Sequence, residues 1–267
     1  MAAAQPGQTP DPLGAPAPGG SRVGSAPETG AGPAAAGPAA AADPAGPGGS
    51  HFLALVSRMR YIERWALMRS SRSENLAEHS LEVAMVAHML CTLGNVRHGR
   101  ALDADHAAVV ALYHDASEIV TGDMPTPVKY HDGVLRDAYK QVEHEAEARL
   151  LATLPDDLRP TYERVFWPGG AGAAGTGADG GGIADADAGA AAVDPDELYL
   201  RRLVKAADKI SALLTCVSER QAGNTEFRSA EASCRAAVDA MAAELPEVAD
   251  FLDEFLPSYG ATLDELI

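Results

Sequence analysis

Residues 111–129 read "ALYHDASEIVTGDMPTPVK" and contain four imidazole or carboxylate side chains: His114, Asp115, Glu118 and Asp123. Apolar residues surround the His-Asp pair on both sides, so the sequence predicts that the pair is buried in a core helix. An unpaired charge is costly to bury, and buried ionisable groups therefore have charged partners or bind a metal. The rest of the chain has to supply those partners.

Two further apolar segments carry an ionisable residue in the middle of the run. His79 lies in "NLAEHSLEVAMV" (residues 75–86), and Asp208 lies in "LVKAADKISALL" (residues 203–214). One such residue is usually a hydrogen-bonded polar group of the core, but one in each of three helices predicts convergence on a shared ion. Imidazoles and carboxylates together suit Mn, Fe, Co, Ni or Zn.

A second His-Asp pair serves as an internal comparison. His131 and Asp132 follow two prolines and precede Gly133, outside any apolar run. This context predicts a solvated turn. A His-Asp dipeptide alone is therefore weak evidence for a metal site, and the apolar context of the first pair carries the inference.

Hydrophobic spacing predicts an all-α core, since no segment alternates in the manner of a strand. The expected helices cover residues 51–69, 75–93, 103–120, 132–154, 195–222, 226–244 and 247–255. The expected N-terminal signals are Ser50, Asn75 with Glu78, Asp103 or Asp105, and Asp194 with Pro195 and Glu197. The expected stops are Gly94, Gly122, Pro155 and Gly223. The 75–93 segment is apolar nearly all round and should be central.

Two segments are too rich in Ala, Pro and Gly to bury an apolar face. Residues 1–49 are predicted to be a disordered tail, and residues 169–193 a flexible loop inserted into one domain that spans 50–267. Insertion between two helices is tolerable because loop closure costs little per added residue.

Composition excludes several classes of protein. The net charge of −17 argues against a nucleic-acid polymer as partner. No apolar run is long enough to span a membrane, and no secretory signal is recognisable, so a cytoplasmic location is expected. The three scattered cysteines are expected to be reduced thiols. A small phosphorylated substrate is still allowed, because a metal and a few arginines can make a local positive pocket.

The order of His79, His114-Asp115 and Asp208 resembles the HD-domain metal-dependent phosphohydrolases. Longer runs are similar to the bacterial 5′-deoxynucleotidase branch of that family: "RWALMRSSRSENLAEHSLEVAMVAH" (64–88), the 111–129 stretch, "VKAADKISALL" (204–214) and "FLPSYGATLDEL" (255–266). The resemblance covers residues 51–168 and 195–267. It implies an HD-domain helical bundle.

The resemblance also implies the ligand set and the reaction. His79, His114, Asp115 and Asp208 would hold one divalent cation, such as Co²⁺ or Mn²⁺, which lowers the pKa of its water and neutralises phosphate charge. The substrate would be a deoxyribonucleoside 5′-monophosphate. Glu118 is expected to position or activate the attacking water. Asp123 is expected to contact the substrate and is the other candidate for proton transfer, and the sequence does not decide between the two carboxylates.

Arg64 and Trp65 are expected to orient the phosphate and to favour sugars that lack a 2′-hydroxyl. Arginine forms a natural fork for phosphate oxygens. The full set expected to contact the substrate comprises Arg64, Trp65, His79, Asp115, Asp123, Met124, Pro125, Thr126 and Asp208. The family also implies a homodimer.

Two alternatives stay open at this level. The metal site could serve a nucleoside triphosphate or a cyclic nucleotide, although a triphosphate needs more cationic grip than Arg64 and its neighbours offer. A non-catalytic helical nucleotide-binding module is the other alternative. The intact ligand set with Glu118 and Asp123 argues against it.

Overall fold

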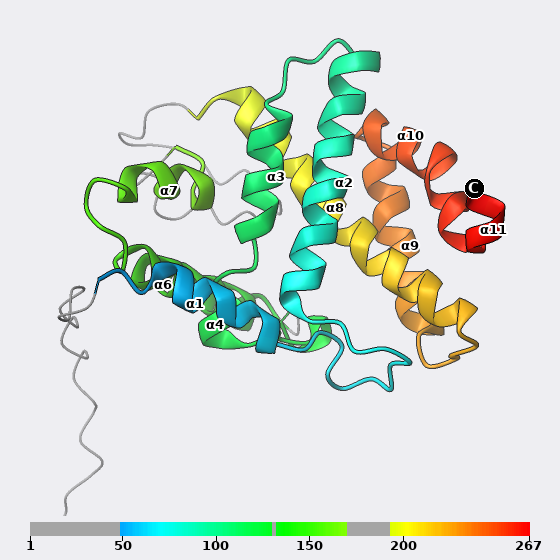
Figure 1. Ribbon diagram of the computed structural model, residues 1–267, viewed down its shortest axis with the longest axis horizontal. Helices are drawn as coiled ribbons and strands as arrows, with labels where there is room; N and C mark the ends of the chain where they lie inside the picture. Colours follow the sequence, from blue (N-terminus) through cyan, green and yellow to red (C-terminus); the bar gives the residue numbers. More distant parts are fainter. Residues whose placement is uncertain (1–48, 130–131, 170–192) are drawn as a thin grey trace, which may run out of the picture. The chain divides into compact units, whose positions relative to one another are not determined.

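The computed structural model describes residues 49–129, 132–169 and 193–267, and within these ranges the chain folds into helices (Figure 1). The helices are α1 (Phe52–Val56), η1 (Ser57–Tyr61), α2 (Leu76–Arg97), α3 (Ala104–Tyr113), α4 (Glu118–Thr121), α5 (Thr126–Lys129), α6 (Gly133–Leu151), α7 (Arg159–Phe166), α8 (Pro195–Gln221), α9 (Arg228–Ala242), α10 (Pro246–Glu254), η3 (Leu256–Gly260) and α11 (Leu263–Leu266). The extended pairing in these ranges is an isolated antiparallel bridge between Glu63 and Asn75. The all-α prediction is confirmed. The predicted tail (1–49) and inserted loop (169–193) lie, apart from their end residues, outside the described ranges.

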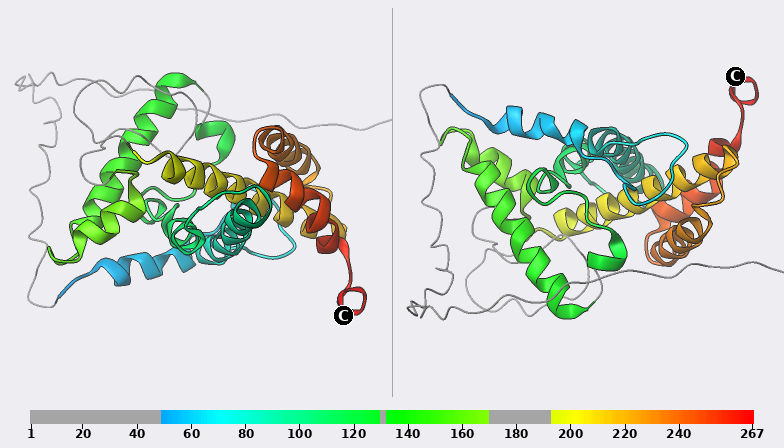
Figure 2. Two further views of the ribbon diagram at one scale, coloured as in Figure 1. Left: turned by 90° about the horizontal axis from the view of Figure 1, so that it is seen from above. Right: turned by 90° about the horizontal axis from the view of Figure 1, so that it is seen from below.

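Helix α2 is the central element, as its apolar sequence predicts. It packs against α3 and α8, and α8 packs in turn against α9. Figures 1 and 2 show α8 crossing beside α2 and α3, with α9 next to its C-terminal half, while α10 packs against α2 and α9. Val83 and Leu90 of α2 and Leu203 and Ile210 of α8 are fully buried. The core therefore lies where α2, α3 and α8 meet.

A smaller aromatic group fixes the C-terminal end of α3. The Phe52 ring from α1 lies 4.8 Å from the ring of Tyr162 in α7 and 6.1 Å from that of Tyr113. Tyr113 is the last residue of α3. The pair His114-Asp115 follows directly, so this packing positions the pair.

Most predicted helix starts are confirmed. Asn75 and Glu78 form a capping box at α2, and Asp103 accepts a hydrogen bond from the His106 backbone at α3. Asp194 accepts from the Asp196 backbone ahead of α8, with Pro195 in the first turn. The prediction that Glu197 completes this cap is wrong, because its carboxylate accepts a hydrogen bond from Arg201 Nε at 2.6 Å. At α1 the Phe52 N–H donates to Ser50 Oγ at 3.3 Å, although the capping position is His51.

The predicted helix over 51–69 is wrong beyond Tyr61. The chain becomes extended at Ile62 and pairs with the residues before α2: Arg64 N–H donates to Glu74 O, and Leu76 N–H donates to Ile62 O, both at 2.9 Å. Contacts with residues farther along the sequence thus override a helical hydrophobic pattern. The bend places Arg64 and Trp65 beside the start of α2.

Three other predicted helices also differ from the structure in their bounds. Helix α2 does not stop at Gly94 but continues to Arg97. The glycine with positive φ that follows this helix is Gly99 (66°). The 103–120 helix is interrupted after Tyr113 by a turn and resumes as α4, which ends at Gly122 as predicted. Helix α6 ends at Leu151, before the predicted position 154.

No helix in the described ranges combines the length and apolar character needed to cross a membrane. Cys91 and Cys216 are buried, Cys234 is half-buried, and all three are free thiols.

Gly94→Ala is expected to destabilise the protein by about 1–3 kcal/mol, although alanine is normally the better helix former. A Cβ at Gly94 would lie 2.8 Å from Glu247 Oε1. Glu247 is fully buried and accepts hydrogen bonds from the Tyr199 hydroxyl, so its carboxylate cannot move without losing them. Urea unfolding measures the effect. Gly133→Ala is the control, because its Cβ would meet Arg136 Nη2 at an ordinary 3.9 Å; a Gly94 variant as stable as this control would contradict the packing argument.

Candidate active site

His79 projects from the first turn of α2 and its side chain is fully buried. Its Nδ1 lies 3.1 Å from Ser211 Oγ of α8. Its Nε2 points to two carboxylates, 3.3 Å from Asp208 Oδ1 and 3.7 Å from Asp115 Oδ2. The capping box at the start of α2 and the apolar faces around His79 hold the helix, and therefore the imidazole, in place.

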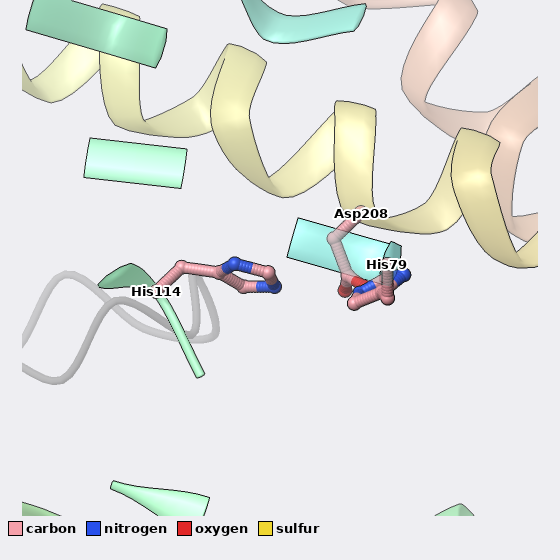
Figure 3. A group of neighbouring side chains, drawn as sticks. All are labelled: His79, His114 and Asp208. Atoms are coloured by element: carbon pink, nitrogen blue, oxygen red, sulfur yellow. The ribbon is translucent and has the colours of Figure 1, made fainter. Parts of the chain in front are cut away.

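His114 approaches from the turn that follows α3. Its Nδ1 lies 2.7 Å from the carbonyl oxygen of Ala111, which fixes Nδ1 as the protonated nitrogen. Its Nε2 lies 3.1 Å from Asp115 Oδ2. The His79 and His114 rings are 5.4 Å apart, and Figure 3 shows His114 reaching toward the adjoining side chains of His79 and Asp208.

We call His79, His114, Asp115 and Asp208 the His/Asp cluster. His79, His114 and Asp208 offer ligand atoms that lie within 4.8 Å of one another, an arrangement able to hold a metal ion. That group does not include Asp115, which instead lies beside both imidazoles and 3.5 Å from Arg64 Nη1. The Nε2 atoms of both histidines are buried and lack a hydrogen-bond partner. Buried polar atoms without partners call for an explanation, and a divalent transition metal bound by nitrogen and oxygen donors fits both.

Burial and charge set the protonation of the cluster. Burial lowers the pKa of His79, and the positive charge of Arg64 acts in the same direction. For Asp115, burial raises the pKa, but the adjacent His114 outweighs it and the net shift is downward. The pKa of Asp208 is also lowered, because Lys209 and His79 outweigh the effect of burial. Both carboxylates are therefore ionised at neutral pH, as metal ligands must be.

Arg64 is buried among these carboxylates. Its Nη1 lies 3.5 Å from Asp115 Oδ2, and its Nε lies 3.7 Å from Glu74 Oε1. Burial lowers its pKa, but the negative charges of Asp208, Asp115, Glu74 and Asp123 outweigh burial and the net shift is upward. Arg64 Nε has no hydrogen-bond partner. Guanidinium N–H groups that lack a partner can donate hydrogen bonds to a phosphate oxygen.

Trp65 is held in an unusual backbone conformation, with φ at 59°. Left-handed backbone is costly for a bulky residue and persists where the surroundings enforce it. The indole Nε1 donates to Glu74 Oε2 at 3.2 Å, and the ring packs at 5.3 Å on the edge of Phe227. Glu74 also accepts a hydrogen bond from Thr215 Oγ1 of α8 at 2.9 Å. Sequence reasoning missed Glu74, and no motif or spacing indicates its role.

Glu118 and Asp123 are both close enough to Arg64 for its positive charge to act on their pKa. Glu118 is buried, with a side-chain oxygen that has no hydrogen-bond partner. Burial, together with the negative charges of Asp115 and Asp123, raises its pKa to about 9. Burial also raises the pKa of Asp123, whose carboxylate accepts a hydrogen bond from the Trp65 backbone. Glu118 is thus not a solvated surface residue.

The remaining predicted substrate contacts are less well defined. Met124 is half-buried and Pro125 is exposed, and among the described residues neither forms a hydrogen bond or ion pair with the His/Asp cluster. The side chain of Thr126, like His131, lies outside the described part of the chain, whereas Asp132 is exposed and caps α6.

Sequence reasoning also missed Ser211 and Glu82. Ser211 follows Asp208 by three positions on α8, and Glu82 follows His79 by three positions on α2. Residues three apart share a helix face, so spacing alone could have placed both near the predicted ligands.

Comparison with known proteins identifies the family of this chain. The family model described as 5′-deoxynucleotidase YfbR-like matches residues 51–178 and 189–259. A 5′-deoxynucleotidase of Shewanella oneidensis is 40% identical over 217 residues, which cover 81% of this chain and 97% of the relative. The 5′-deoxynucleotidase of Vibrio cholerae is 41% identical over 217 residues, with 81% and 98% covered. The 5′-deoxynucleotidase YfbR of Escherichia coli is 37% identical, with 81% and 96% covered.

Solved structures show the fold. An HD-domain phosphohydrolase from Listeria innocua superposes with a TM-score of 0.60 and 23% identity, over 80% of this chain and 90% of that one. The PH0347 protein from Pyrococcus horikoshii gives a TM-score of 0.51 and 18% identity, over 79% and 97%. The predicted HD-domain helical bundle is confirmed.

Glu118→Gln is expected to stabilise the metal-stripped protein at about pH 8 by on the order of 5 kcal/mol, and to have little effect near pH 4. The pKa of Glu118 is raised from 4.5 to about 9 in the folded protein. Between these values the native state keeps a proton that the unfolded chain has released, so the contribution of Glu118 to stability falls as pH rises. Glutamine does not ionise and escapes this loss.

Urea unfolding in EDTA at several pH values measures the difference between wild type and variant. Glu145→Gln is the matched control, because Glu145 is an exposed residue of α6. A Glu118→Gln curve parallel to the wild-type curve would show that Glu118 is not held protonated.

Proposed function

This chain belongs to the YfbR-like 5′-deoxynucleotidase family, and from that premise we propose that the His/Asp cluster forms its active site together with Arg64 and Trp65. The enzyme is a phosphoric monoester hydrolase of the HD-domain type that converts deoxyribonucleoside 5′-monophosphates to deoxynucleosides and phosphate. The relatives named 5′-deoxynucleotidase are covered by this chain over nearly their whole length.

The observation that carries the site is that α2, α8 and the turn after α3 bring their ionisable side chains to one point. Ligand atoms of His79, His114 and Asp208 lie within 4.8 Å of one another. Arg64 adjoins this group through its ion pair with Asp115. We propose that these residues, with Asp115, hold one divalent cation of the Co²⁺ or Mn²⁺ type. Such a cation, when bound, neutralises phosphate charge and supplies a nucleophile at neutral pH.

The protein's own residues then account for binding and proton transfer. Arg64 is placed to bind phosphate oxygens with the donors that the protein leaves unused, and to stabilise the charge that develops on them. The Trp65 indole, fixed by Glu74 and Phe227, would restrict the space next to the sugar.

Glu118 and Asp123 are the proposed groups for proton transfer. Both are carboxyl groups with raised pKa beside Arg64. Either can transfer a proton, to the departing 5′-oxygen or from the attacking water. We assign the transfer to this pair and not to one member.

A nucleoside triphosphate needs more cationic contacts than this site provides. Arg69 and Arg72, which follow Arg64 in the sequence, are exposed and pair with Glu226 and Glu78. In a binding module without a metal, the buried Nε2 atoms of His79 and His114 would have no partner to compensate for their burial.

A cytoplasmic location and a homodimer complete the proposal. Free cysteines in all three positions support a reducing compartment. Light scattering of the purified chain would test the dimer.

Metal-stripped protein is expected to release phosphate only after a divalent cation is added back, and from deoxyribonucleoside 5′-monophosphates in preference to ribonucleotides. The assay is orthophosphate release from a panel of both series with Mn²⁺, Co²⁺, Mg²⁺ or Zn²⁺. Equal rates on ribonucleotides would contradict the proposed role of Trp65 in selecting deoxyribonucleotides. Pyrophosphate, triphosphate or a linearised nucleotide as product would replace the proposed reaction.

Asp208→Ala is expected to lower metal content and activity together by at least about tenfold, because it removes one of the proposed ligands. Glu118→Ala should retain metal and fold but lose most turnover, by about 10²-fold or more. Metal analysis and phosphate release are measured on the same preparations. Asp105→Ala is the control, since the Asp105 side chain is 96% exposed. Full activity in the Glu118 variant would remove that residue from the mechanism.

A further inference from the structure

His79 has a second set of contacts, on the side of the ring that faces away from the cluster. Its Nδ1 lies 3.1 Å from Ser211 Oγ, and Ser211 Oγ donates to Glu82 Oε2 at 2.6 Å. His79 and Ser211 are fully buried, and Glu82 is half-buried on the same helix as His79. These contacts form a continuous chain, Glu82–Ser211–His79, between α2 and α8.

The direction of this chain follows from proton counting. A serine hydroxyl has one proton and two acceptor lone pairs. Because Ser211 donates its proton to Glu82, it can only accept from His79, and Nδ1 must carry the imidazole proton. Nε2 is then unprotonated and presents its lone pair to Asp208, Asp115 and His114.

The other neighbour of Nδ1 does not provide the same restraint. Glu74 Oε1 lies at 3.6 Å from Nδ1, which is beyond hydrogen-bonding distance. The Glu74 carboxylate already accepts hydrogen bonds from Trp65 and Thr215. Ser211 is therefore the hydrogen-bond partner of Nδ1.

We propose that Glu82 and Ser211 are positioning residues that hold the His79 imidazole as the Nδ1-protonated tautomer, with Nε2 aimed into the His/Asp cluster as a metal ligand. The proposal rests on the proposed function, in which His79 binds the cation. Metal-ligating histidines are commonly oriented in this way by a hydrogen bond at the second nitrogen, and losing such a partner costs about 10- to 100-fold in metal affinity.

The tautomer can be measured without metal or substrate. Long-range proton–nitrogen NMR on the metal-free, ¹⁵N-histidine-labelled wild type reports which nitrogen of His79 carries the proton, with the signal assigned by its loss in His79→Asn. Protonation at Nδ1 is expected. Protonation at Nε2 would overturn the proposal, because it means that the chain runs in reverse, from a protonated Glu82 through Ser211 to Nδ1. This result does not depend on activity, so it separates failure of the inference from failure of the proposed function.

Ser211→Ala should weaken Mn²⁺ or Zn²⁺ binding by about 10-fold or more, measured by competition with a chelator, and should shift the His79 tautomer. Ser80→Ala is the matched control. Ser80 follows His79 on α2 and is equally buried, but its hydroxyl has no hydrogen-bond partner. Metal affinity in Ser211→Ala that equals the Ser80→Ala value would overturn the proposal.

Glu82→Leu provides a second variant at a half-buried position, in case Ser211→Ala does not fold. It should also weaken metal binding, because Ser211 loses the acceptor that orients its hydroxyl. Since Glu82 acts through Ser211, the double variant should bind metal no more weakly than Ser211→Ala alone. Additive losses would show that the two residues act independently and would contradict the chain.

Discussion

One buried cation, Arg64, balances the carboxylates that the helices of this protein bring together. Its guanidinium lies 3.5 Å from Asp115 and 3.7 Å from Glu74, and Asp208 and Asp123 also act on it. Buried carboxylates without a compensating charge would be strongly destabilising. Because Arg64 must reach this position, the chain bends after η1 and pairs with the residues before α2. Trp65, in the same segment, has its φ at 59°.

Burial acts on every ionisable group of the site, and neighbouring charges reverse its effect on the pKa of some groups, such as Asp115, but not of others, such as Glu118. Asp115 has an imidazole 3.1 Å away and its pKa falls, despite complete burial of the carboxylate. Glu118 is buried and the negative charges of Asp115 and Asp123 act on it, so its pKa rises to about 9. One site thus supplies ionised ligands and a protonated acid at the same pH, which is the usual means by which active sites separate the roles of chemically similar groups.

The sequence predicted those parts of the site that depend on local patterns. His79 and Asp208 stood out as ionisable residues inside apolar runs, and capping at Asn75 and Asp103 is a local signal. The errors came from contacts between distant residues. Gly94 reads as a stop, but it lies within α2 and faces Glu247, whose position along the chain gives no hint of the contact. The bend at Ile62 likewise depends on the pairing of Glu63 with Asn75.

Because the predicted 103–120 helix is interrupted, the side chains of His114 and Asp115 can lie close together. On a continuous helix, adjacent side chains diverge by about 100°, so His114 and Asp115 would point in different directions. In the turn after α3, Asp115 Oδ2 instead lies 3.1 Å from His114 Nε2 and 3.7 Å from His79 Nε2. The aromatic packing of Tyr113 holds the last turn of α3, and Gly122, with φ at 72°, ends α4 just before Asp123. A short irregular segment between two fixed points can therefore direct two adjacent side chains and Glu118 to one place, which a regular helix cannot do.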